Sequence, residues 1–185
     1  MGKLVHSSIA SLDGYVNDEG GSFDWAAPDE ELHAFVNDLV RPAEVHLCGR
    51  RMYEVMQYWE TAGGPEDPPV IQDFARMWRA SDKIVVSRSL GAVTTARTTL
   101  VESFDPQAVA RLKDASSMVT IGGPTLAAEA YRAGLVDEVQ IVFVPYVAGG
   151  GTAALPKGWQ GRLDLLEERR FTSGAVFLRY EVVPA

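Results

Sequence analysis

The sequence predicts an α/β protein with a mostly parallel sheet that is covered by helices on both faces. Short apolar runs alternate with amphipathic segments along most of the chain, and turns rich in glycine or proline separate them. The ending differs, because two extended runs flank Thr172, Ser173 and Gly174. This pattern predicts a hairpin that adds antiparallel at one edge of the sheet. With no internal repeat and no break in composition, residues 1–185 are expected to form one domain.

The individual elements follow from the same pattern. Strands are expected at residues 3–10, 44–48, 83–87, 98–101, 117–121 and 138–145, where apolar and β-branched residues gather. Helices are expected at residues 28–40, 50–58, 71–80, 106–114 and 124–133. Pro28, Pro106 and Pro124 stand near helix starts, and Gly134 follows the last helix as a C-cap. The segment 60–69, rich in proline and glycine, predicts a surface loop.

Composition excludes several classes of function. The formal net charge of -8 argues against a nucleic-acid surface, which needs a basic field. No stretch is apolar enough to span a membrane, and the first residues lack the apolar core of a signal peptide. The single cysteine, Cys48, excludes an internal disulfide, and three scattered histidines show no zinc spacing, so no metal site is expected. We therefore expect a soluble cytoplasmic protein that binds small molecules.

Three strand ends carry the functional signal. The stretch MVTIGGPTLAAEAYRAG, residues 118–134, runs from a strand through two glycines into a helix whose free N–H groups favour an anion. VHLCGRRMYEVM (45–56) repeats this arrangement, and KIVVSRSL (83–90) ends a third strand with Ser87 and Arg88. Parallel strands end on one side of a sheet, so the three turns can line one crevice that fits a dinucleotide. Arg50, Arg51 and Arg88 could hold an additional ribose phosphate, which favours NADPH over NADH. The glycine turns can equally be structural, with no ligand bound to them. The dinucleotide-binding fingerprint G-x-G-x-x-G of Rossmann folds is absent.

The same segments carry a family resemblance. SIASLDGYV, DWAAPDEEL, CGRRMYEVMQYW, VVSRSL, IGGPTLAAEAYRAGLVDEV and VPYVAGGGTAALP resemble the dihydrofolate reductase-like superfamily, in particular the branch of the C-terminal reductase domain of bacterial riboflavin biosynthesis. The resemblance implies a three-layer fold with a mixed sheet of about eight strands, NADPH as hydride donor and a homodimer. It also implies that the cofactor is contacted by Ala10, Gly49, Arg50, Arg51, Ser87, Arg88, Ile121, Gly122, Gly123, Pro124 and Thr125. The loop 13–25 would lie against the nicotinamide.

The substrate is less well indicated. Trp25, Pro28 and Glu30 keep the spacing of a tryptophan, a proline and an acid found in dihydrofolate reductases. Riboflavin-pathway reductases share SLDG but continue with a segment that holds a ribose phosphate, where this chain has DWAAPDEE. We expect reduction of a small, pterin- or pyrimidine-like heterocycle, similar to 5-amino-6-(5-phosphoribosylamino)uracil or dihydrofolate. A nucleotide-binding or dimerising protein without catalysis is the alternative.

Reduction of a C=N or C=O bond needs a hydride and a proton, so a carboxyl group near the reacting atoms is useful. Asp13, Glu30 and Asp29 are the candidates. Asp13 can instead bond its own turn, and Asp29 and Glu30 can simply begin a helix. The aromatic residues Trp25, Tyr53 and Trp59 could enclose a flat ring, although Tyr53 also fits a core position.

Other polar or reactive residues have simpler structural interpretations. Cys48 at a strand end is expected to be a small buried side chain, and His6 and His46 on strands are expected to be satisfied structural residues. The glycines at 149–151 indicate a bulge or tight turn, either beside the cofactor or purely structural.

Overall fold

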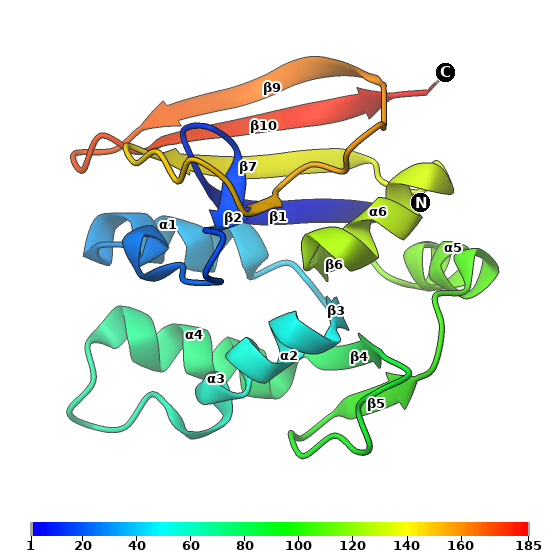
Figure 1. Cartoon of the computed structure of the whole chain (residues 1–185). Coiled ribbons are helices and arrows are strands. Elements are labelled where there is room, and N and C mark those ends of the chain that lie inside the picture. The colour runs from blue at the N-terminus through cyan, green and yellow to red at the C-terminus, as the bar shows by residue number, and fades with distance from the viewer. Residues whose placement is uncertain (1, 185) are drawn as a thin grey trace.

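The computed structural model describes residues 2–184, whose centre is an eight-stranded sheet (Figure 1). Its spatial order is β5 (Thr98–Val101), β4 (Asp82–Val86), β3 (Val45–Gly49), β6 (Met118–Gly122), β1 (Lys3–Ser11), β7 (Glu138–Val144), β10 (Val176–Val183) and β9 (Arg162–Arg170). The strands from β5 to β7 pair in parallel, whereas β10 pairs antiparallel with both β7 and β9. The predicted mixed sheet with a C-terminal antiparallel hairpin is confirmed.

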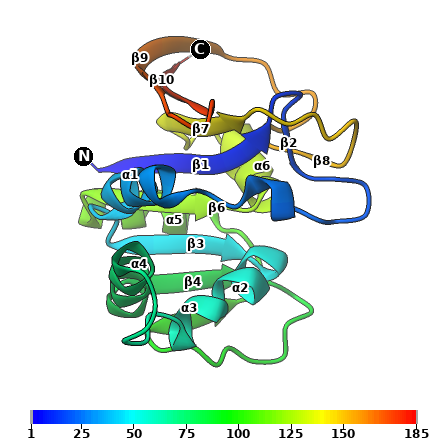
Figure 2. The same cartoon turned by 90° about the vertical axis from the view of Figure 1, so that its left-hand side faces the viewer.

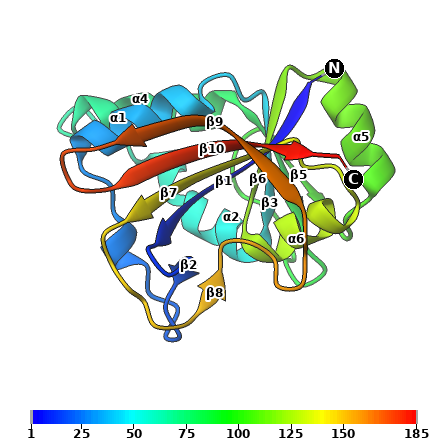
Figure 3. The ribbon, with the colours of Figure 1, turned by 90° about the horizontal axis from the view of Figure 1, so that it is seen from above.

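Helices lie on both sides of this sheet (Figure 3). They are α1 (Glu30–Val40), α2 (Arg50–Met56), α3 (Tyr58–Thr61), α4 (Pro69–Ala80), α5 (Pro106–Ala115) and α6 (Pro124–Arg132). Pro106 and Pro124 occupy first-turn positions, where a missing N–H costs nothing. Gly134 follows α6 at φ +65°, the left-handed conformation that ends many helices. No helix among residues 2–184 has the length and apolar character needed to cross a bilayer.

Alternation along the strands divides the core into two main layers. Leu4, Ile121 and Val139 face α5 and α6, where they pack with Leu126 and Tyr131. On the opposite face, strands β7 and β10 and helix α1 form a smaller cluster that includes Val142, Phe177 and Leu32. Both sheet faces are therefore covered at the central strands, as parallel strands require.

The connections contain elements that the sequence pattern does not indicate. The strand β2 (Tyr15–Asn17) pairs antiparallel with β8 (Thr152–Ala153), and the short helix η1 (Asp24–Ala26) follows β2. Helix α4 begins at Pro69, two residues before the expected start, because this proline also fits the first turn. β2 and β8 lie at the carboxyl end of β1 and not within the main sheet (Figure 2).

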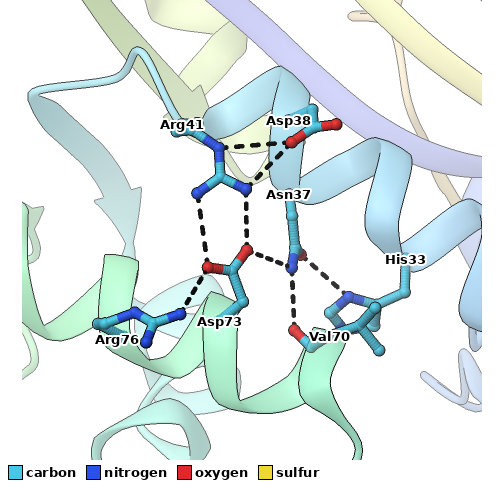
Figure 4. A network of polar contacts seen from close by, with 7 residues as sticks. All are labelled: His33, Asn37, Asp38, Arg41, Val70, Asp73 and Arg76. Atoms are coloured by element: carbon cyan, nitrogen blue, oxygen red, sulfur yellow. Dashed lines mark hydrogen bonds and ion pairs between the residues drawn. The ribbon is translucent and has the colours of Figure 1, made fainter.

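A polar network joins α1 to α4 (Figure 4). The Asp73 carboxylate accepts hydrogen bonds from Arg41 at 2.9 Å, from Arg76 at 2.9 Å and from the Asn37 amide at 3.1 Å. Arg41, Arg76 and Asn37 together lower the pKa of Asp73 from 3.8 to about 2, with Arg41 the largest cause. The ionised form of Asp73 therefore stabilises the packing of these two helices.

Because the pKa of Asp73 is depressed, its contribution is complete above pH 3.8 and is lost as pH falls toward 2. We expect Asp73→Asn to lower the free energy of unfolding by about 2 kcal/mol at neutral pH, and by progressively less as the pH falls below about 4. Urea unfolding of both proteins across this range measures the difference. Asp38→Asn is the control, since Asp38 bonds the same Arg41 but is 75% exposed. A difference between wild type and Asp73→Asn that is independent of pH would contradict the prediction.

Candidate functional site

The carboxyl ends of β3 and β6 place two glycine turns side by side. Cys48 and Gly122 are paired across these neighbouring strands, so the turns into α2 and α6 follow directly. A β-carbon placed on Gly123 would lie 3.5 Å from Cβ of Met52 and 3.9 Å from the backbone nitrogen of Gly49. The two turns thus face the crevice that parallel α/β sheets leave outside the carboxyl ends of their strands, with the Met52 side chain beside them.

Gly123 serves two purposes at this crevice. Its φ of +89° lies in the left-handed region, so the turn requires glycine whether or not a ligand binds. Gly123 is also the N-cap of α6 and has no side chain to bond the first-turn N–H groups, which leaves them for an external acceptor. Thr125, in that first turn, is exposed to solvent. The geometry therefore suits an anionic group at the start of α6.

Three other residues that were predicted to contact the cofactor have side-chain positions facing the protein interior. Gly122 leaves room for Met52, because a β-carbon there would lie 3.2 Å from Cε of Met52. Ala10 and Ile121 are buried in the core at 0% and 1% exposure. Their side chains therefore belong to the core, and contact of Ala10 and Ile121 with the cofactor stays a prediction for their backbone atoms.

The three predicted arginines have different surroundings. Arg50 pairs with Glu54 along α2 at 3.5 Å. Arg51 lines a hollow of about 350 Å³ beside β2 and β8, together with the acidic residues Asp18 and Glu19. Arg88 is exposed directly after β4. A phosphate near Arg51 would meet acidic neighbours, so Arg88 is the better candidate for a phosphate contact.

The loop that carries Arg88 is held by two hydroxyl groups. Ser87 Oγ accepts hydrogen bonds from the backbone N–H of Ser89 at 3.2 Å and of Leu90 at 3.0 Å. Tyr53, which is 0% exposed, accepts the N–H groups of Thr94 at 2.9 Å and Thr95 at 3.2 Å. Burial raises the pKa of Tyr53, but hydrogen bonds from Thr95 and Thr94 outweigh it and lower the pKa to about 8. The burial of Tyr53 and its bonds to this loop favour the core interpretation of this residue, and its contact with a substrate stays untested.

Asp13 joins two loops at the carboxyl ends of β1 and β7. Its carboxylate accepts a hydrogen bond from Ser11 Oγ at 2.6 Å and from the N–H groups of Ala148 and Gly149 at 3.0 and 2.8 Å. The Ser11 bond first, and then the backbone bonds, lower the pKa of Asp13. A carboxylate that is stabilised in its ionised form is a poor proton donor, so these contacts favour the structural alternative for Asp13.

The start of α1 separates the other two acids. Asp29 is the N-cap, and its Oδ1 accepts the N–H of Leu32 at 2.9 Å. Glu30 is the first helical residue, and its side chain is exposed. Since Asp13 and Asp29 are both bonded to backbone donors, Glu30 is the remaining candidate for proton donation.

Aromatic side chains lie on both sides of α1. Trp25 packs against the cluster that contains Leu32 and stacks on Tyr146, with ring centroids 5.0 Å apart and an interplanar angle of 12°. The Trp25 indole nitrogen is buried without a hydrogen-bond partner among the described residues. Trp59 instead meets His33 edge to face at 5.7 Å. The two tryptophans therefore border the same helix but do not form one wall.

Tyr146 and His33 were missed by sequence reasoning. Tyr146 follows Pro145 where the chain leaves β7, and an aromatic residue at a strand end was the available signal. His33 lies three residues after Glu30, so helical spacing places both on one face. The remaining histidines match expectation, because His6 bonds Tyr131 and His46 bonds Thr120.

A second hollow, of about 380 Å³, lies near Trp78 and His46 where β3 and β4 begin. It is at the opposite end of the strands from the glycine turns. Parallel α/β sheets bind ligands outside the carboxyl ends of their strands, so the crevice is the better candidate site. Gly151 lines the smaller hollow beside Arg51, and its main role is structural. A β-carbon on it would lie within 1.9 Å of the Asn17 carbonyl oxygen, so this glycine allows β8 to approach β2.

The strand order and the crevice define an α/β domain with the dihydrofolate reductase-like fold. The chain belongs to the RibD C-terminal domain family, whose profile matches residues 3–177. The uncharacterized protein YyaP of Bacillus subtilis is 22% identical over 180 residues, which are 96% of this chain and 94% of YyaP.

Solved structures agree on the fold. A putative riboflavin biosynthesis protein from Shewanella sp. PV-4 superposes with a TM-score of 0.76 at 18% identity, over 98% of this chain and 99% of that one. A pyrimidine reductase-like protein from Corynebacterium diphtheriae gives 0.70 at 16% identity, over 100% and 93% of the two chains. These structures show the same fold, and the profile match confirms the family inferred from the motifs.

Proposed function

We propose that this protein is an NADPH-dependent reductase of a small, flat heterocycle of the pyrimidine or pterin type. The observation that carries this proposal is the pair of glycine turns at Gly49 and Gly123, which meet at the N-terminus of α6. Membership of the RibD C-terminal domain family and the likeness to a pyrimidine reductase-like protein support the reaction class.

The residues of the crevice fit this cofactor. The pyrophosphate would lie against Gly123, where the first-turn amides of α6 can donate to it. Arg88 would bond the ribose phosphate, while Ser87 holds the loop that carries this arginine. When bound, the nicotinamide supplies a hydride. The chain itself would position the substrate beside α1, and Glu30 would donate the proton.

We expect NADPH to bind at least about 10-fold more tightly than NADH, a difference of about 1.4 kcal/mol that one charge-assisted phosphate contact can supply. Arg88→Ala should remove most of this preference, because NADH lacks the phosphate that Arg88 would bond. Calorimetric titration of the wild-type protein and the variant with NADPH and with NADH measures this preference. Arg132→Ala is the matched control, since Arg132 is an exposed arginine at the far end of α6.

Two results would change the proposal. Equal affinity for both cofactors in the wild-type protein would remove the NADPH assignment. Tight NADPH binding without oxidation by any compound in a panel of pterins, pyrimidines and carbonyl compounds would favour a non-catalytic nucleotide-binding protein on this fold.

We further propose that the hairpin of β9 and β10 forms a homodimer interface. The hairpin exposes Leu165 at 52% and Leu166 at 44% on the edge strand β9, and Val176 at 37% on β10. Large apolar side chains exposed together on an open sheet edge mark an association surface. Leu166 has no partner in the pairing of β9 with β10. Arg179 of β10 pairs with Glu167 and the next residue, Tyr180, pairs with Leu165, so the register shifts at Leu166. Sedimentation analysis should show a dimer, and Leu165→Lys should shift it toward monomer. A monomeric wild-type protein at micromolar concentration would contradict this assignment.

A further inference from the structure

His33 occupies a buried position on the face of α1 that also carries Glu30. It is 8% exposed, and its Nδ1 lies 3.0 Å from Oδ1 of Asn37. Its ring meets Trp59 and Phe74 edge to face, at centroid distances of 5.7 and 5.8 Å. The imidazole is therefore fixed in place by both aromatic and polar neighbours.

The network around Asn37 determines which nitrogen of His33 carries the proton (Figure 4). The Asn37 Nδ2 group lies 2.9 Å from the Val70 carbonyl oxygen and 3.1 Å from the Asp73 carboxylate, and both of these groups can only accept. The amide nitrogen must point at them, so Oδ1 must face the histidine. An amide oxygen accepts, and His33 Nδ1 is therefore the donor.

A proton fixed on Nδ1 leaves Nε2 of the neutral ring as a hydrogen-bond acceptor. The two nitrogens of an imidazole point in roughly opposite directions, so Nε2 points away from Asn37. Helical spacing of three residues brings the side chains of Glu30 and His33 to about 5–6 Å between their β-carbons. On α1 the exposed carboxylate of Glu30 thus lies about one turn from the largely buried imidazole of His33, with Trp59 alongside.

We propose that His33 is a substrate-positioning residue whose Nε2 accepts a hydrogen bond from an N–H group of the heterocycle. This inference rests on the proposed reductase function, and it narrows the substrate to rings with amino or ring N–H donors, such as aminopyrimidines and pterins. Asn37 and Asp73 act through His33, because they hold the proton on Nδ1.

The tautomer can be tested without any activity. Long-range ¹H–¹⁵N NMR at about pH 8.5 should show a protonated Nδ1 and an unprotonated Nε2 for His33. Asn37→Ala should shift the population toward the Nε2–H form. A wild-type spectrum with the proton on Nε2 would overturn the proposal.

The role in substrate binding is tested with two variants that imitate different halves of the ring. Asparagine places its amide near the Nδ1 position, and glutamine places its amide near the Nε2 position. A 2,4-diaminopyrimidine and 7,8-dihydrobiopterin are the probes, titrated in the presence of saturating NADPH. The comparison uses whichever probe binds the wild-type protein more tightly. We expect His33→Asn to weaken its binding about 10-fold, and His33→Gln to retain more of the wild-type affinity.

A purely structural role predicts the reverse order, since asparagine preserves the contact with Asn37 and glutamine does not. That reverse order, or a probe that binds while leaving the Nε2 resonance of His33 unchanged, would overturn the proposal. NADPH affinity, measured separately, should be the same in both variants. If the wild-type protein fails to bind NADPH, the reductase function falls, whereas normal NADPH binding with an insensitive His33 rejects only the present inference.

Discussion

Replacing Gly123 by valine should lower NADPH affinity by about 100-fold or more, close to 2.7 kcal/mol. The added side chain would stand between the first turn of α6 and the Gly49 turn, where a pyrophosphate would approach the backbone. Valine also strains a backbone held at φ +89°, at a cost of about 1–3 kcal/mol. Because a domain of this size is stable by about 5–15 kcal/mol, the variant should remain folded.

The strain and the loss of the ligand site can be separated within the same helix. Gly134 also has a positive φ, +65°, but lies beyond the C-terminal end of α6, and a β-carbon there would meet no atom within 4 Å. Gly134→Val should therefore lower the melting temperature and leave NADPH affinity unchanged. Calorimetry and circular dichroism on both variants provide the comparison. Normal NADPH binding by a folded Gly123→Val protein would show that this turn serves only the chain.

The elements predicted from sequence are those in which local pattern and tertiary burial agree. The strand at residues 117–121 and the proline that begins α6 are examples, because apolar alternation and first-turn chemistry act over a few residues. The C-terminal hairpin was also predicted, since its turn residues separate two long extended runs. In each case the information is contained within one segment.

The parts of the site that sequence reasoning missed depend on distant contacts. The bonds from Ala148 and Gly149 to Asp13 join residues 135 and 136 positions apart, and the pairing of β2 with β8 joins the same two loops. β2 and β8 span only three and two residues. This is too short for an alternation of apolar and polar residues to be recognised in the sequence. The stack of Trp25 on Tyr146 has the same origin. Tyr53 illustrates the converse, because an aromatic residue near a glycine turn fits a pocket and a core equally well until its burial is known.

A carboxylate-to-amide change at Glu30 should lower the rate of hydride transfer by about 100-fold, within the range that positioned acids contribute. Glu30→Gln keeps the shape of the side chain and should leave NADPH affinity nearly unchanged, because Glu30 lies on α1 and on neither of the glycine turns that would hold the pyrophosphate. Asp29→Asn is the control. Asparagine is an equally good N-cap, so this variant should keep both the helix and the rate.

Asp13→Asn should behave differently from both variants at the start of α1. An amide cannot accept as strongly from Ser11 and from two backbone N–H groups, so the loops after β1 and β7 should loosen, and cofactor affinity and rate should fall together. Single-turnover hydride transfer, followed against pH with whichever heterocycle is reduced, separates these outcomes. With Glu30 as the donor, hydride transfer should be about 100-fold slower in Glu30→Gln than in wild type. Equal rates in wild type and Glu30→Gln would mean that water delivers the proton, and the acids at the start of α1 would then serve only the helix.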